Sequence, residues 1–299
     1  MKVGCLLFFL LGSWVMGQSP FLTQPLMMYL GNRYPAALGL LEYAQWHIGV
    51  ERMQQFSTAT YQQHMTWVRP TAGDRWTLGL HITNEERFVV KRQQGSVGWA
   101  FRLPLTPRKN IYLGTRIHGN SSMYSFELLQ HIERPDPLLD LPNHFWMAFS
   151  TSLAYQSKQG YVLLGVNNSP LSRTKPPLSL IIAPSYYLLL GRTFDFDAAV
   201  QMKSVIGIEK EVAAPVYFGF FQLHIPWDIQ LGLYMNSERK ARILWQQPFL
   251  PQWEVGFAYG QGRRPFGKKQ FGLSLTYRWA PSFSNHIPVK SLEYGLENK

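Results

Sequence analysis

The sequence predicts an all-β protein, a transmembrane β-barrel of a bacterial outer membrane with about 14 antiparallel strands. The 299-residue chain is 46% hydrophobic and 15% aromatic but only 16% charged, which is well below the charged share of a soluble domain. A mean hydropathy of −0.14 argues against a bundle of membrane-spanning helices. From about residue 47 onward, apolar and polar residues alternate with a period of two, and helical periodicity is nearly absent.

The alternation is clearest in the last expected strand, residues 271–279. Every odd-numbered residue there is leucine or aromatic, and the even-numbered residues are Gly272, Ser274, Thr276 and Arg278. The same pattern returns over 76–83, 97–103 and 253–260. A soluble sandwich would carry Lys, Glu and Thr on its second face, whereas small residues here suit a crowded barrel lumen. A soluble β-sandwich or β-propeller is the alternative fold.

The lengths of the expected connections support the barrel independently. Short and long connections alternate over most of the chain, as in outer-membrane barrels with short periplasmic turns and long outer loops. This predicts that both termini are periplasmic. Aromatic residues near strand ends fit the girdles at the membrane interfaces, namely Trp67, Trp76, Tyr155, Trp227, Trp253 and Trp279. The expected strands lie near residues 47–54, 57–68, 75–83, 95–103, 110–119, 143–155, 159–166, 183–190, 194–205, 214–224, 227–235, 242–247, 252–260 and 270–279.

Four segments are expected along the chain. Residues 1–17 have the positive, apolar and small-residue regions of a signal peptide, with a buried N-terminal strand or helix as the alternative. Residues 18–46 do not alternate and form an N-terminal periplasmic segment, residues 47–279 form the barrel, and residues 280–299 form a polar tail. Cys5 is the only cysteine, so the processed chain is expected to have no disulfide.

The chain is basic, with a formal net charge of +11. Nucleic acid is an unsuitable partner for an exported protein, so lipid phosphates or an acidic protein are better candidates. Arg263, Arg264, Lys268 and Lys269 gather in one expected outer loop and are candidate contacts for an anion or a partner. The alternative is that these cations only keep the loop solvated. Residues 262–269 resemble a P-loop in spacing, but they join two strands instead of a strand and a helix, which argues against nucleotide binding.

No pattern of residues predicts catalysis. The eight histidines are scattered without metal-ligand spacing, and a Gly-x-Ser-x-Gly nucleophile elbow does not occur. Asp195 and Asp197 share one face of an expected strand, which suits an acid–base pair or, more commonly, two inward carboxylates in a polar lumen. The sequence therefore predicts no enzyme, no cofactor and no metal site.

Several short segments resemble the PorP/SprF family in order along the chain. They begin with residues 19–26 (SPFLTQPL), 32–39 (NRYPAALG) and 43–46 (YAQW) and continue with residues 78–85 (LGLHITNE). Later matches in order and type are residues 161–168, 186–196, 253–259 and 271–279. The chain departs from the family pattern at Ser19, where members carry Asp, at Tyr43, where they carry Arg, and at Arg33-Tyr34, which interrupt an Asn-Pro pair.

The resemblance implies a non-enzymatic outer-membrane barrel of the type IX secretion system of the Bacteroidetes. Members support the export or surface attachment of cargo proteins, including gliding adhesins. The implied partners are outer-membrane lipid, periplasmic and outer-membrane secretion components, and a secreted cargo protein. A porin-like solute channel is the alternative function, and a barrel enzyme is a third.

The lumen is expected to conduct poorly. Bulky or charged residues are expected on the inward faces at Arg102, Arg116, His118, Glu254 and Arg278. The non-alternating segment before the barrel is expected to fold against the periplasmic mouth. A bore set by about fourteen strands would then be narrowed from within.

Overall fold

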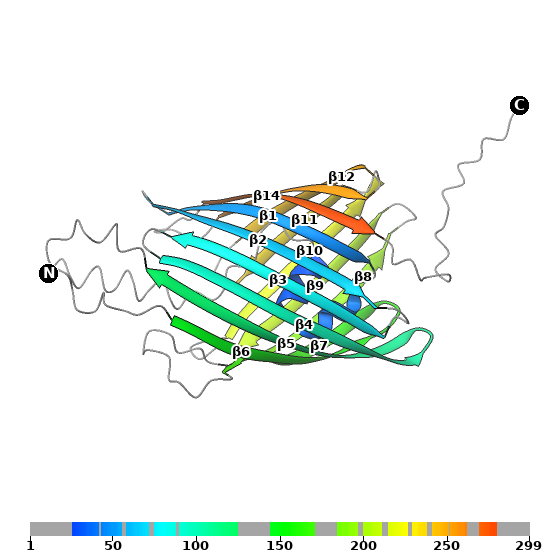
Figure 1. The fold of residues 1–299 in the computed structure, drawn as a ribbon. Coiled ribbons are helices and arrows are strands. Elements are labelled where there is room, and N and C mark those ends of the chain that lie inside the picture. Colours follow the sequence, from blue (N-terminus) through cyan, green and yellow to red (C-terminus); the bar gives the residue numbers. More distant parts are fainter. Residues whose placement is uncertain are drawn as a thin grey trace, which may run out of the picture.

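The computed structural model is a closed antiparallel β-barrel of 14 strands, which confirms the predicted fold class (Figure 1). The structure describes residues 26–41, 43–55, 58–71, 75–87, 90–124, 144–170, 184–196, 200–210, 215–226, 229–237, 241–250, 252–261 and 269–279. Each strand pairs with its neighbours in sequence, and β1 closes the ring against β14 with Ile48 opposite Leu275. Closure leaves no unpaired sheet edge, which is what a sheet in lipid requires.

The described elements are two short helices followed by the fourteen strands. They are α2 (Leu26–Arg33), η1 (Pro35–Leu40), β1 (Ala44–Gln55), β2 (Thr58–Pro70), β3 (Trp76–Arg87), β4 (Val90–Thr106), β5 (Lys109–Tyr124), β6 (His144–Gln156), β7 (Gly160–Pro170), β8 (Ser185–Asp195), β9 (Gln201–Lys210), β10 (Pro215–Ile225), β11 (Ile229–Asn236), β12 (Ala241–Leu250), β13 (Trp253–Gln261) and β14 (Lys269–Trp279). Within the described residues, neither helix has the length and apolar character needed to cross a membrane.

The alternation places apolar side chains outside and polar side chains inside. On β14, Phe271, Leu273 and Leu275 are exposed, whereas Ser274 and Thr276 are buried. The outside of the strands is therefore suited to lipid and the inside to a polar lumen.

The barrel has two distinct ends. At the turn end, β1 begins, β14 ends and few residues separate consecutive strands. At the opposite, loop end, more residues separate some strands, as between Tyr124 and His144 and between Pro170 and Ser185. Exposed aromatic residues mark both ends. Trp46 and Trp76 lie toward the turn end, and the large exposed rings toward the loop end include those of Phe145, Tyr186 and Tyr217.

The predicted girdle residues Trp67, Trp76, Tyr155, Trp253 and Trp279 lie toward the turn end, and Trp227 lies outside the described residues. Trp76 packs against Phe101, with ring centroids 4.7 Å apart. Such packed rings at one level around a barrel are typical of a membrane interface.

Several connections differ from the prediction, among them the one expected between residues 205 and 214, where β9 continues to Lys210 and includes Glu209. The turn expected at residues 191–193 lies at 196–200, because Gly191 is an inward strand residue whose missing Cβ makes room for the ring of Tyr161. Asp195 consequently ends β8 and accepts a hydrogen bond of 2.7 Å from Gln201, and Asp197 lies outside the described residues. The long loop expected at 84–94 is a two-residue connection, because β3 and β4 continue to Arg87 and Val90 as a polar hairpin.

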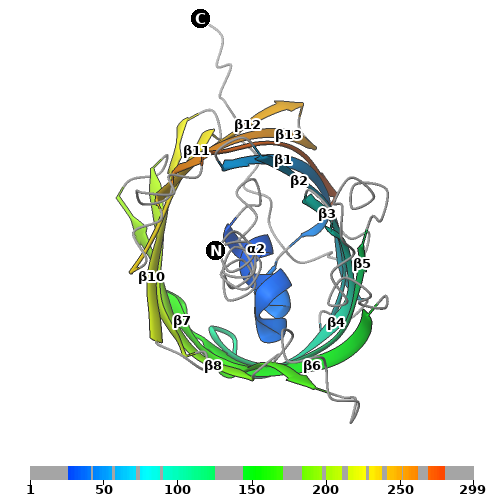
Figure 2. The same cartoon turned by 90° about the vertical axis from the view of Figure 1, so that its left-hand side faces the viewer.

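The two helices lie inside the barrel. Viewed along the barrel axis, the ring of strands surrounds α2 (Figure 2). Residues 26–41 therefore lie in the lumen and not at its mouth, which was the position predicted from the sequence. This lumen segment, defined here as residues 26–41, is the feature on which the functional site is built.

Candidate functional site: a lumen filled by the chain itself

The lumen segment is held first by apolar contacts. On α2, Leu26, Tyr29 and Leu30 are almost completely buried. They belong to one hydrophobic cluster with inward side chains from β5 to β13, namely Tyr112, Ala154, Leu163, Tyr187, Leu189, Val205, Phe218, Phe220, Tyr234, Leu244 and Ala258. An apolar inner wall is unusual in a polar lumen, and the helix keeps it from water.

Glycines let the second helix approach the opposite part of the wall. Gly79 on β3 and Gly98 on β4 face each other in the sheet. A Cβ at Gly79 would lie 2.8 Å from the side chain of Leu38, and one at Gly98 would lie 3.0 Å from it. The glycine pair therefore forms the hollow that receives Leu38 of η1, which is completely buried.

The closest approach between segment and wall is at Gly114 on β5. A Cβ at this position would overlap the backbone of Pro35 and Ala36. The Ala36 amide also donates a hydrogen bond of 2.6 Å to the Ser152 hydroxyl on β6. Only glycine at position 114 permits this backbone contact without displacing one of the two chains.

Consecutive residues of the lumen segment bind opposite walls. The Asn32 amide donates a hydrogen bond of 2.8 Å to the Thr66 hydroxyl on β2. The Arg33 guanidinium donates to the Glu209 carboxylate on β9. Strands β2 and β9 are half a turn apart in the ring of 14. The segment therefore bridges the lumen from wall to wall.

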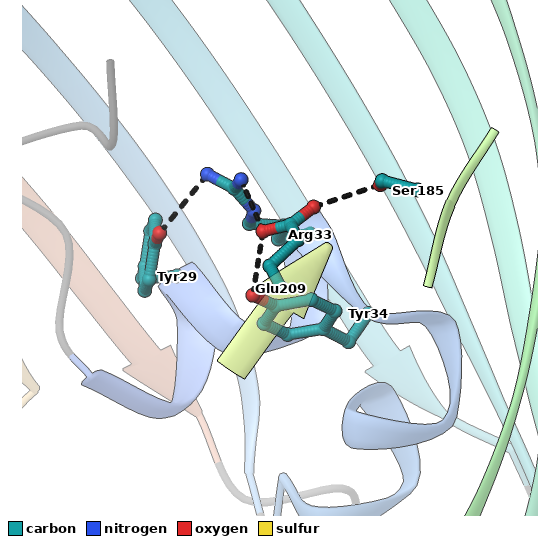
Figure 3. Close-up of polar contacts among 5 residues, drawn as sticks. All are labelled: Tyr29, Arg33, Tyr34, Ser185 and Glu209. Atoms are coloured by element: carbon teal, nitrogen blue, oxygen red, sulfur yellow. Dashed lines mark hydrogen bonds and ion pairs between the residues drawn. The ribbon is translucent and has the colours of Figure 1, made fainter. Parts of the chain in front are cut away.

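The Glu209 carboxylate is the centre of a buried polar cluster (Figure 3). One oxygen accepts from Arg33 and, at 3.4 Å, from the Tyr34 hydroxyl; the other accepts from the Ser185 hydroxyl at 2.9 Å. Arg33 also donates to the Tyr29 hydroxyl at 3.4 Å. Buried charges are stable only when they are paired and hydrogen-bonded, as here.

The two segment residues in this cluster have shifted pKa values. Burial has the largest single effect and lowers the pKa of Arg33, but the Glu209 carboxylate and the neighbouring tyrosines Tyr29, Tyr34 and Tyr234 together outweigh it, so the pKa lies well above its usual value. Burial and the same carboxylate raise the pKa of the Tyr34 hydroxyl. Arg33 therefore stays charged and Tyr34 stays a donor at any physiological pH.

A third polar anchor comes from β5. The guanidinium of Arg116 donates to the carbonyl oxygen of Gly31 near the end of α2. The last carbonyls of a helix have no partner within the helix, and a cation there is favourable. Arg116 thus binds the helix end whose position also fixes Asn32 and Arg33.

The residues predicted for the inner face lie there. Arg116, His118 and Glu254 are buried, and Arg278 forms an ion pair of 2.6 Å with Glu254. Arg102 donates to Asn110 at 3.0 Å. These side chains add polar bulk to the lumen.

The structure brings together three histidines that are scattered in the sequence. His47 and His64 approach with Nε2 atoms 3.1 Å apart, and His81 contacts the Thr66 hydroxyl at 2.8 Å. Within the described ranges, no group of three or more His, Cys, Asp or Glu side chains is placed to hold a metal ion. These histidines connect neighbouring strands and the lumen segment through hydrogen bonds.

Of the predicted anion contacts, the structure describes Lys269 alone. It is exposed at the loop end as the first residue of β14. Arg263, Arg264 and Lys268 lie outside the described residues. Sequence reasoning missed Glu209, because the misplaced turn assigned it to a loop. Val205, Gly207 and Glu209 are alternate residues of β9 and therefore share its inner face, and this alternation is the sequence signal that could have located Glu209.

A comparison with protein families identifies the family to which this chain belongs. The family model described as "Type IX secretion system membrane protein PorP/SprF" matches residues 30–279. The chain belongs to the PorP/SprF family. The match covers all fourteen strands and most of the lumen segment, so this PorP/SprF protein is an outer-membrane barrel of the type IX secretion system. No match was found among curated proteins.

Solved structures show the same fold at low sequence identity. A deletion mutant of the TodX monoaromatic hydrocarbon channel is 8% identical with a TM-score of 0.56, covering 89% of this chain and 97% of that one. The toluene transporter TbuX of Ralstonia pickettii is 9% identical with a TM-score of 0.54, covering 84% and 93%. The outer membrane protein Omp33 of Acinetobacter baumannii is 9% identical with a TM-score of 0.53, covering 80% and 99%.

Proposed function

We propose that this PorP/SprF protein is a non-enzymatic barrel that supports the export or surface attachment of particular cargo proteins, with gliding adhesins among the candidates. The observation that carries the proposal is the family match over residues 30–279. Its partners are then periplasmic and outer-membrane components of the type IX secretion system and a secreted cargo protein.

The filled lumen favours this function over a solute channel. A channel needs a continuous water path between its ends, whereas residues 26–41 bridge the lumen between β2 and β9. The bridge combines apolar packing with a buried ion pair, so it is a stable part of the fold.

The second candidate is a porin-like channel. It is favoured by the resemblance of the barrel to hydrocarbon channels, which extends over most of both chains. An apolar inner wall would also suit an apolar solute. Here, however, Leu26, Tyr29 and Leu30 already cover that wall, which favours the secretion function.

The proposed orientation places the turn end and both termini in the periplasm. Short periplasmic turns and longer outer loops are the usual arrangement in outer-membrane barrels. In this orientation Arg263, Arg264, Lys268 and Lys269 lie outside the cell. Four neighbouring cations there would attract lipid phosphates or an acidic face of cargo.

Purification from the native membrane tests the proposed partners. The tagged protein is extracted in mild detergent, and its companions are quantified by mass spectrometry against an unrelated outer-membrane barrel of similar abundance. We expect type IX secretion components to be enriched with this protein and not with the control barrel. Recovery of the barrel without any such component would contradict the proposal.

A further inference from the structure

A row of polar side chains on β5 faces the lumen near the loop end and leaves part of its hydrogen-bonding capacity unused. His118, Asn120 and Ser122 are alternate residues of the strand and are 4%, 3% and 1% exposed. Within the part of the chain that the structure describes, no partner is present for His118 Nε2, Asn120 Nδ2 or Ser122 Oγ. A buried polar atom left unpaired destabilises a fold, so three in one row call for a functional explanation.

Two further residues extend the row sideways. Asn167 on β7 is 5% exposed, and its Oδ1 also has no partner among the described residues. Trp146, on the strand between them, lies opposite Asn120 and meets the His118 ring edge-on at 6.0 Å. The row therefore combines unpaired donors and acceptors with an aromatic surface.

The chemistry of the row points to a ligand with both donors and acceptors. The unpaired Asn120 Nδ2 is a donor and the unpaired Asn167 Oδ1 is an acceptor, while a hydroxyl serves as either. These are the complements of a peptide group, which offers one carbonyl oxygen and one N–H. The four residues of the row carry no carboxylate or ammonium group, and the neighbouring cations are Arg92, opposite Ser122 on β4, and Arg116, two residues before His118 on β5.

The spacing of the row also matches an extended peptide. Alternate residues of a strand repeat at about 6.6 Å, and alternate residues of a bound extended chain repeat at the same distance. A segment lying along β5 would therefore present equivalent backbone groups to His118, Asn120 and Ser122 in turn. An aromatic ring beside the row would contact its side chains.

We infer that His118, Asn120, Ser122 and Asn167 form a binding strip for an extended segment of an exported polypeptide. The inference rests on the proposed secretion function and names the part of the barrel that contacts the cargo. The strip lies at the loop end of the lumen, near the end of β5 at Tyr124.

Site-specific crosslinking in living cells tests the strip. In a Cys5→Ser background, Ser122→Cys provides one thiol in the row, and Ser121→Cys provides a matched thiol on the lipid-facing side of the same strand. Both are labelled with a maleimide that carries a photoreactive group. We expect Ser122→Cys to crosslink to an exported protein that is missing from the surface of a deletion strain, and Ser121→Cys not to do so.

A second variant ties the crosslink to the polar row. Asn120→Leu keeps the volume of the side chain and removes its amide, and we expect it to abolish most of the crosslink. Asn84→Leu, on the exposed face of β3, is expected to leave the yield unchanged. Heat-modifiability on gels verifies that both variants fold.

The outcomes separate the strip from the secretion function. If deletion abolishes export but Ser122→Cys captures no polypeptide, only a saccharide or nothing, the strip is overturned and the function stands. If the deletion strain exports normally, the proposed function fails whatever the thiol captures. An unchanged crosslink in Asn120→Leu would also overturn the strip.

Discussion

The Arg33 guanidinium and the Glu209 carboxylate, whose side chains are 20% and 5% exposed, form an ion pair between residues that lie 176 positions apart in the chain. Arg33 belongs to the lumen segment and Glu209 to the barrel wall, so the pair joins the two parts of the fold. Removing one partner of such a pair leaves the other charge buried without compensation.

We expect Glu209→Gln to release the lumen segment. Breaking a buried pair costs about 3–5 kcal/mol, which shifts the balance between the bound and released segment by roughly 10²- to 10⁴-fold. Trypsin should then cut after Arg33, which is shielded in the wild type. Glu86→Gln is the control, because its ion pair with Lys91 is exposed and contributes little. Equal protection of Arg33 in all three proteins would count against the anchoring role.

Glycines on the wall should differ in their tolerance of alanine. We expect Gly114→Ala to displace η1, because its Cβ overlaps backbone, at a cost of about 1–3 kcal/mol or more. Gly79→Ala should be milder, since the Leu38 side chain can rotate. Gly95→Ala is the matched control, because its Cβ would meet no atom within 4 Å. Thermal unfolding measured by gel mobility should rank the variants in this order, and an equal effect at all three sites would refute the close packing.

Much of the fold follows from the sequence because lipid imposes a simple pattern. Exposed Phe271, Leu273 and Leu275 alternate with buried side chains along β14, and a period of two is readable without knowing the partners of a strand. The number of strands was predicted correctly for this reason, whereas the apolar inner wall between β5 and β13 was not predicted.

The misplaced turns have physical causes. Gly191 was interpreted as a turn residue, but it accommodates the ring of Tyr161 within the sheet. At the β3–β4 hairpin, Glu86 pairs with Lys91 at 3.4 Å, so charged residues continue the ladder instead of forming a loop. Glycine and charge signal a turn only when no packing or cross-strand partner explains them.

The lumen segment could not be located from local patterns. Its anchors Thr66, Glu209 and Ser152 lie on strands that closure of the barrel brings together from distant parts of the sequence. The sequence showed that residues 18–46 do not alternate, but not that part of this stretch lies inside the ring.

The purified barrel should conduct poorly until the lumen segment is removed. We expect little stable conductance from the wild type in planar bilayers and large, stable openings after deletion of residues 26–41. Deletion of residues 280–299, the expected polar tail, serves as the control and should leave the wild-type behaviour unchanged. Large openings from the wild type itself would favour the porin-like channel.

We expect the basic connection between β13 and β14 to act through its charge. Replacing Arg263, Arg264, Lys268 and Lys269 with Gln removes four positive charges from one hairpin. We expect weaker retention of surface cargo at low salt and a smaller difference at high salt, because salt screens exposed charges. Cargo retention is measured on washed cells at two ionic strengths. Identical retention at low salt would leave only the solvation role for these residues.

Loss of the gene tests the central claim most directly. Surface and culture-fluid proteins of a deletion strain are compared with those of its parent, together with growth on soluble nutrients. Secretion support predicts that one or several large exported proteins disappear from the surface while nutrient uptake stays normal, and that the intact gene restores them. An unchanged set of secreted proteins together with slowed solute uptake would contradict the account and identify the barrel as a channel.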